Sequence, residues 1–199
     1  MSVGGTARYR TATHIPPLVV RAVVLANELG FEYSCIPEHG RLLRVLAGGR
    51  AGGHIGETGT GCGVGLAWLV SGADASTTFV SVEHDPNLAE RASALFAEHP
   101  NVTVVCGDWS EVLAHAPFDL LVLDGGGAGK QDDAIDPAVA LVPGGMLVID
   151  DFTPAVEWPP QFEGAPDAAR LHWFEHPVVA AAEIRTTPTS ATIVASRRR

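Results

Sequence analysis

Apolar residues recur along the chain at two alternating spacings. Helical spacing runs from Pro16 to Leu29 and again over residues 36–46, and glycines end both runs. Beyond Gly65, short β-branched runs alternate with amphipathic ones. We expect strands at 79–83, 102–106, 118–124 and 146–150, and helices from Gly65 to Val70 and at 87–98, 110–114 and 132–141. This alternation predicts an α/β protein in which helices cover both faces of a parallel sheet.

The two ends of the chain have a different character. The first dozen residues are small and polar, so we expect them to be frayed. Residues 180–186 and 189–196 read as strands joined by Thr187-Pro188, which predicts a hairpin and one antiparallel strand. No repeat or linker divides the chain. We therefore expect a single domain over residues 1–199.

Within that domain we distinguish three parts. Residues 1–50 hold the N-terminal helices, residues 51–151 the core of alternating strands and helices, and residues 152–199 a segment that ends in the C-terminal hairpin. The length fits one domain with a sizeable core.

Composition narrows the class of partner. The formal net charge of −10 argues against a nucleic-acid backbone, because phosphate binding needs a basic surface. No apolar stretch approaches the roughly 20 residues of a membrane span, and no signal peptide opens the chain. Cys35, Cys62 and Cys106 suggest neither a disulfide framework nor a zinc site. We expect a soluble cytoplasmic enzyme, with neither nucleic acid nor a membrane as partner.

A glycine-rich segment is the strongest chemical signal. Residues 54–65 read as a short strand that reaches Glu57, a turn with glycine at 59, 61 and 63, and a helix that begins at Gly65. Such a junction brings the main chain close to a nucleotide-like cofactor, because glycine has no Cβ and adopts positive φ. The spacing does not complete the G-x-G-x-x-G of dinucleotide-binding proteins, and no lysine makes a P-loop.

Acidic residues follow several of the expected strands. Glu83 ends the second strand, where a carboxylate can accept both ribose hydroxyls, and His84 adjoins it. Asp124 ends one later strand and Asp150-Asp151 end the next. Carboxyl ends of neighbouring parallel strands share one edge, so three carboxylates would repel there unless a cation such as Mg²⁺ compensates them. The ion would orient a substrate hydroxyl and lower its pKa.

The motif Glu57-x-Gly59-x-Gly61-x-Gly63 resembles the first motif of class I S-adenosylmethionine-dependent methyltransferases. With Asp124 and Asp150-Asp151, the chain looks like cation-dependent O-methyltransferases of the catechol and caffeoyl-coenzyme A type and their short bacterial relatives. The resemblance implies a Rossmann-like, seven-stranded, mostly parallel sheet. It also implies S-adenosylmethionine as cofactor, with residues 51–151 as the cofactor-binding core and residues 152–199 as the substrate-side segment. Homodimers are frequent among such proteins.

The resemblance also suggests roles for individual residues. Glu57 would lie near the methionine part of the cofactor, and Asp124 would line the cofactor site. Asp108 would accept from the adenine amino group with Trp109 beside the ring, although Asp108 could instead cap a helix at Ser110. Asp124, Asp150 and Asp151 would bind the metal ion.

The chain departs from that family at the expected base. The catechol-type enzymes place a lysine, and the short bacterial relatives a histidine, where this chain has Gly127. The catechol-type enzymes also place Asp-Asn where it has Asp150-Asp151, whereas the bacterial relatives carry an Asp-Asp pair. Lys130, the only lysine, could swing inward from its glycine-rich loop, or it could be a surface residue. We take Asp124, Asp150 and Lys130 as catalytic candidates, and His39 and His84 as alternatives for the base.

Several interpretations of function stay open. The leading one is O-methylation of a small-molecule hydroxyl, with or without a metal ion. The alternatives are a metal-independent methyltransferase acting on another acceptor and a non-catalytic S-adenosylmethionine-binding protein. Aromatic residues after Asp151 could wall a substrate, form a dimer contact or belong to the core: Trp158, Phe162, Trp173 and Phe174.

Overall fold

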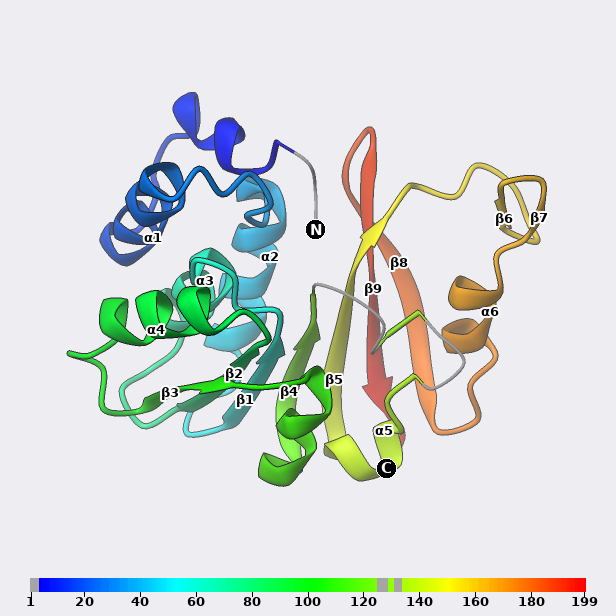
Figure 1. Ribbon diagram of the computed structural model, residues 1–199. Helices are drawn as coiled ribbons and strands as arrows, with labels where there is room; N and C mark the ends of the chain where they lie inside the picture. Colours follow the sequence, from blue (N-terminus) through cyan, green and yellow to red (C-terminus); the bar gives the residue numbers. More distant parts are fainter. Residues whose placement is uncertain (1–3, 125–128, 131–133) are drawn as a thin grey trace.

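The computed structural model describes residues 4–124, 129–130 and 134–199, and its centre is a seven-stranded sheet (Figure 1). The strand order is β3-β2-β1-β4-β5-β9-β8, and β9 runs antiparallel to both of its neighbours. The strands are β1 His54–Thr58, β2 Thr78–Glu83, β3 Val102–Cys106, β4 Phe118–Leu123, β5 Leu141–Phe152, β8 Val179–Thr187 and β9 Ser190–Arg197. The predicted sheet and its one antiparallel strand are confirmed.

Helices cover both faces of this sheet, as Figure 1 shows for α1–α4 over β1–β3. One buried cluster joins the first helices to β1, β2, β4 and β5, and a second joins the later helices to β2, β4, β5 and the hairpin. The first set is α1 Pro17–Glu28, α2 Pro37–Gly48, α3 Val64–Gly72 and α4 Pro86–Leu95; the second is the 3-10 helix η2 Trp109–His115, α5 Pro137–Ala140 and α6 Ala168–Phe174. A small separate hairpin pairs β6 Gln161–Phe162 with β7 Ala165–Pro166. In the described part of the chain, we find no helix long and apolar enough to cross a bilayer.

Two sequence-based expectations are wrong. The helix predicted over 132–141 is limited to α5, Pro137–Ala140, because Asp136 caps Ala138 and a proline at the first helical position starts the helix there. Residues 131–133 lie outside the described residues. Leu141 instead begins β5, which continues through the glycines at 144 and 145 to Phe152.

The N-terminal residues described here are not frayed. Thr6–Arg10 form the 3-10 helix η1, and Thr6 is buried, with its hydroxyl donating to Ser34 Oγ at 2.8 Å. The Tyr9 hydroxyl donates to the carbonyl of Cys35 at 2.9 Å. The N-terminal segment therefore fixes residues 34–35, which lead into α2.

The glycine-rich strand β1 is explained by its neighbours. A Cβ added at Gly56 would lie 2.7 Å from Leu121 Cδ1 and 2.8 Å from the Phe118 ring. These side chains fill the space beside the central strand, so the missing side chain allows them to pack. The weak strand propensity of glycine is offset by this packing.

Helix α2 packs directly on α3 through a glycine. A Cβ at Gly40 would lie 2.2 Å from Trp68 Nε1, and the Trp68 indole is completely buried. That indole N–H donates to the Tyr9 hydroxyl at 2.9 Å. Trp68, Tyr9 and the Cys35 carbonyl thus form a chain of hydrogen bonds that holds the start of α2 over the sheet.

We therefore expect Gly40→Ala to destabilise the protein by about 1–3 kcal/mol, because the added methyl group overpacks the Trp68 contact. Thermal and urea unfolding measure this effect. Gly49→Ala at the end of the same helix is the matched control, since its Cβ would approach Leu46 O no closer than 3.4 Å. Equal stability of the two variants would show that the close packing of α2 on Trp68 does not require glycine at position 40.

Candidate functional site

The turn between β1 and α3 requires glycine at three positions. Gly59, Gly61 and Gly63 have φ values of +81°, +54° and +81°, in the left-handed region that side chains disfavour. A Cβ at Gly63 would also lie 2.8 Å from the Phe96 ring. The alternating glycines of the sequence motif are therefore conformational requirements of this turn.

Glu83 holds the turn in place from the end of β2. Its Oε2 accepts from the Gly61 amide at 2.7 Å, and its Oε1 accepts from the Asp85 amide at 2.8 Å. An ionised carboxylate offers about four lone-pair positions, so two remain for further donors. Glu83 can thus support the glycine turn and accept ribose hydroxyls together.

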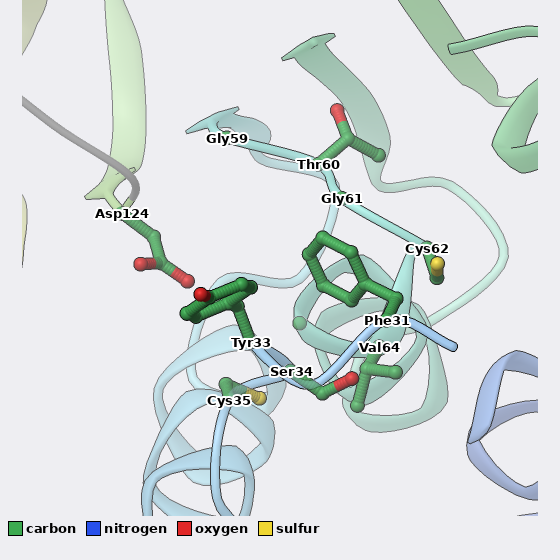
Figure 2. A pocket seen from close by; sticks show the side chains of 11 residues that line it. Phe31, Tyr33, Ser34, Cys35, Gly59, Thr60, Gly61, Cys62, Val64 and Asp124 are labelled. Atoms are coloured by element: carbon green, nitrogen blue, oxygen red, sulfur yellow. The ribbon is translucent and has the colours of Figure 1, made fainter. Parts of the chain in front are cut away.

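A hollow lies over the turn, and residues from outside the glycine motif form its other wall (Figure 2). Its lining comes from the segment before α2, the glycine turn and the end of β4: Phe31, Tyr33, Ser34, Cys35, Gly59, Thr60, Gly61, Cys62, Val64, Gly65 and Asp124. The enclosed volume is about 10 Å³, room for about one water molecule. In this arrangement residues 31–35 cover the turn.

Residues 31–35 are the part of the site that sequence reasoning missed. The Phe31 and Tyr33 rings meet edge to face with centroids 5.8 Å apart. Phe31 approaches the place of a Gly61 Cβ to 3.0 Å. The sequence does show two aromatic residues, Phe31 and Tyr33, between the first two helices. Their spacing alone does not indicate that they lie over the glycine turn.

Glu57 lies beneath the turn and is buried. Its Oε2 accepts from the Ser81 hydroxyl at 2.6 Å, and its Oε1 would lie 2.5 Å from a Cβ at Gly65. Burial raises the pKa of Glu57 to about 8, despite the Ser81 hydrogen bond, and the nearby charges of Asp124 and Glu83 raise it further. Glu57 is therefore mostly protonated at neutral pH.

Asp124 and Asp150 come together at the ends of β4 and β5. Each follows one member of the parallel pair Leu123–Ile149, so the two residues are neighbours across the strands. Burial raises the pKa of the Cys35 thiol, and the charges of Asp124, Asp150 and Glu57 add to that effect. The thiol therefore stays neutral beside this group of carboxyl side chains.

Asp151 follows Asp150 near the end of β5. Its backbone turns to φ +65°, and its carbonyl accepts a hydrogen bond from Lys130. Among the residues that the structure describes, no three histidine, cysteine or acidic side chains are arranged to hold a metal ion. Metal binding by Asp124, Asp150 and Asp151 stays a prediction, and we derive no step through an ion.

Lys130 points inward. Its Nζ donates to the Asp151 carbonyl at 2.6 Å and lies 4.4 Å from the centre of the Phe152 ring. Burial lowers the pKa of Lys130 to about 8, while the charges of Asp150 and Asp124 oppose that shift. The ammonium group supplies positive charge where the sequence suggested a metal ion. Gly127, where the family carries its base, lies outside the described residues.

Lys130 is anchored through its neighbour Gly129. The buried Trp173 indole donates to the Gly129 carbonyl at 2.7 Å, and a Cβ at Gly129 would lie 2.5 Å from Ile149. Trp173 is therefore a core residue. Trp158 stacks on Phe174 with centroids 5.9 Å apart and remains largely exposed, as does Phe162.

The remaining predicted cofactor residues follow β2 and β3. Asp108 is exposed and caps η2, accepting from the Ser110 amide at 3.1 Å and its hydroxyl at 2.7 Å, and these bonds lower its pKa. Trp109 is half-buried against the core, and His84 is exposed. The capping interpretation of Asp108 is confirmed, whereas contacts of Asp108, Trp109 and His84 with adenosine stay predictions.

Comparison with known proteins agrees with this geometry. A family model described as a methyltransferase domain matches residues 57–152. A protein from Mycobacterium avium, named provisionally as an O-methyltransferase, is 33% identical over 115 residues, covering 54% of this chain and 50% of the relative. A similarly named protein from Mycobacteroides abscessus is 34% identical over 120 residues, covering 57% and 56%. The chain matches about half the length of these relatives.

Solved structures agree over nearly the whole chain. The O-methyltransferase TomG from Streptomyces achromogenes, in complex with S-adenosylmethionine, has a TM-score of 0.73 at 20% identity and covers 98% of this chain and 96% of its own. An O-methyltransferase from Bacillus cereus, in complex with S-adenosylhomocysteine, has a TM-score of 0.75 at 17% identity with the same coverage. The predicted class I methyltransferase fold is therefore confirmed.

Glu57 should make stability depend on pH. Its pKa is about 8 in the folded protein and 4.5 when exposed, so between these values the folded state holds a proton that the unfolded state has lost. The free energy of unfolding then falls as pH rises, by up to about 1.4 kcal/mol per pH unit.

In Glu57→Gln this fall between about pH 5 and pH 8 should be absent, which urea unfolding across that range measures. Glu90→Gln on the exposed face of α4 is the control and should keep the wild-type slope. A wild-type slope in Glu57→Gln would show that Glu57 is ionised in the folded protein.

Proposed function

We propose that this protein transfers a methyl group from S-adenosylmethionine to a hydroxyl oxygen of a small molecule. One observation carries the proposal: Asp124, at the end of β4, lines the same hollow as the glycine turn. The cofactor turn and the acidic strand ends therefore belong to one site. The fold and the names of the similar proteins favour the same chemistry.

The chain's residues fit this cofactor. The glycine turn provides close backbone approach, Glu83 has acceptor positions for the ribose, and Glu57 lies beneath the turn. We assign Asp108, Trp109 and His84, beyond the ends of β2 and β3, to the adenosine end, and Asp124 to the end that carries the sulfonium. When bound, S-adenosylmethionine supplies the electrophilic methyl group.

We assign the acceptor to a second hollow, beside Asp150. It has a volume of about 240 Å³ and lies between the start of α2, the end of β5 and the β8–β9 turn. Its lining is Ile36, Asp150, Asp151, Phe152, Thr153, Thr189, Ser190 and Ala191. The volume of this hollow is below the roughly 300 Å³ of the smallest pockets that hold drug-sized ligands, which favours a small acceptor.

The reaction forms a carbon–oxygen bond and breaks the carbon–sulfur bond of the sulfonium. The acceptor hydroxyl loses its proton, and the products are S-adenosylhomocysteine, a methyl ether and that proton. Asp124 and Asp150 orient the hydroxyl, and the Lys130 amine, held by the Asp151 carbonyl, takes the proton. A pKa of about 8 leaves part of Lys130 as the neutral amine near neutral pH, and the ammonium group formed by the proton transfer is favoured by Asp124 and Asp150, so the proton has an acceptor without a metal ion.

The direct test is formation of S-adenosylhomocysteine with a panel of phenols, sugars and hydroxyl-bearing thioesters, with and without EDTA. We expect turnover with at least one hydroxyl acceptor and the same rate in EDTA. Loss of turnover in EDTA with recovery in Mg²⁺ would restore the metal-assisted alternative. Calorimetric binding of S-adenosylmethionine without turnover would support a non-catalytic binding protein, and absence of binding would overturn the proposal.

Lys130→Met should lower kcat by about 10²–10⁴-fold while calorimetry finds unchanged affinity for S-adenosylmethionine, because the amine acts on the acceptor. Lys130→Arg keeps the positive charge but cannot act as a base, so it should not restore the rate. Wild-type activity in Lys130→Met would remove this residue from the mechanism.

A further inference from the structure

A buried histidine that the proposed reaction does not use lies beside Asp150. His39 is the third residue of α2, and its side chain is 1% exposed. Its Nδ1 is 3.4 Å from Asp150 Oδ1, and in the described part of the chain neither ring nitrogen has a hydrogen-bond partner. Buried polar groups in this condition are rare and cost about 1–3 kcal/mol.

The strand pattern explains why this contact exists. Leu147 and Ile149 pack into the cluster with α5 and α6, whereas Val148 packs into the cluster with α1–α3. Since side chains alternate along a strand, Asp150 falls on the side of α2. The Gly40–Trp68 contact, one residue beyond His39, allows α2 to pack closely on α3 and so fixes the position of His39. His39 therefore faces a strand-end carboxylate from a rigid element.

We propose that His39 is a positioning residue for Asp150. A closing movement of a few tenths of an ångström gives an ordinary hydrogen bond in which Nδ1–H donates to Oδ1. This bond fixes the carboxylate plane and leaves Oδ2 for the acceptor hydroxyl. The catalytic part of the inference rests on the proposed function, whereas the hydrogen bond itself does not.

The hydrogen bond can be tested without any acceptor. In protein labelled with ¹⁵N-histidine, long-range ¹H–¹⁵N spectra identify which ring nitrogen of His39 carries the proton, with His39→Asn used for assignment. We expect a proton on Nδ1 with an exchange-protected, downfield signal that moves upfield in Asp150→Ala. A proton on Nε2 alone, or a signal unaffected by Asp150→Ala, would overturn the proposal.

Steady-state kinetics of His39 variants distinguish a residue that positions Asp150 from one that only fills space in the core. His39→Leu should lower kcat by about 10–100-fold with the KM for S-adenosylmethionine unchanged. His39→Asn should restore much of the rate, because its amide nitrogen lies near the place of Nδ1. His39→Gln should not, because its amide reaches toward the place of Nε2.

Two further outcomes complete the test. Equal rates in the asparagine and glutamine variants, or a wild-type rate in His39→Leu, would reduce His39 to a packing residue. Thermal unfolding of each variant keeps loss of fold apart from loss of rate. If no acceptor is methylated the proposed function fails, and the NMR arm still decides whether His39 binds Asp150.

Discussion

Acidic side chains gathered at the ends of three neighbouring strands are the constraint on which this site depends. Glu57, Asp124 and Asp150 belong to the neighbouring strands β1, β4 and β5, and all three raise the pKa of the buried Cys35 thiol just before α2. Ionised carboxylates cannot share a buried space without compensation. The rest of the site consists of the groups that compensate these carboxylates.

Each acidic side chain is compensated in a different way. Glu57 keeps its proton and accepts from Ser81. The Lys130 ammonium is favoured by both Asp124 and Asp150 and is held by the Asp151 carbonyl. His39 faces Asp150 from α2. The His39 contact depends on the placement of α2, which the Gly40–Trp68 contact with α3 and the Tyr9 hydrogen bonds hold. Lys130 is held from the other buried cluster, through Gly129 and Trp173.

Most of the fold and part of the site could be predicted from local patterns. Pro16-Pro17 and Gly30 bracket α1, and β-branched runs mark β2 and β3, so strand ends placed Glu83, Asp124 and Asp150 on one edge. The inward direction of Lys130 was left open, because it depends on Trp173 reaching Gly129 from 44 residues away. Residues 31–35 and the anchoring of Thr6 depend on similar long-range contacts, and Pro137 shortens a helix that periodicity alone extended.

The most direct measurement of the central claim is a crystal structure with S-adenosylhomocysteine. The account predicts its ribose hydroxyls on Glu83, its backbone contacts along Gly59–Gly63, and its sulfur on the side of Asp124 and Asp150, with residues 31–35 moved outward. Binding with the sulfur toward Asp108, or at a place away from the glycine turn, would contradict the assignment of the strand-end carboxylates to methyl transfer.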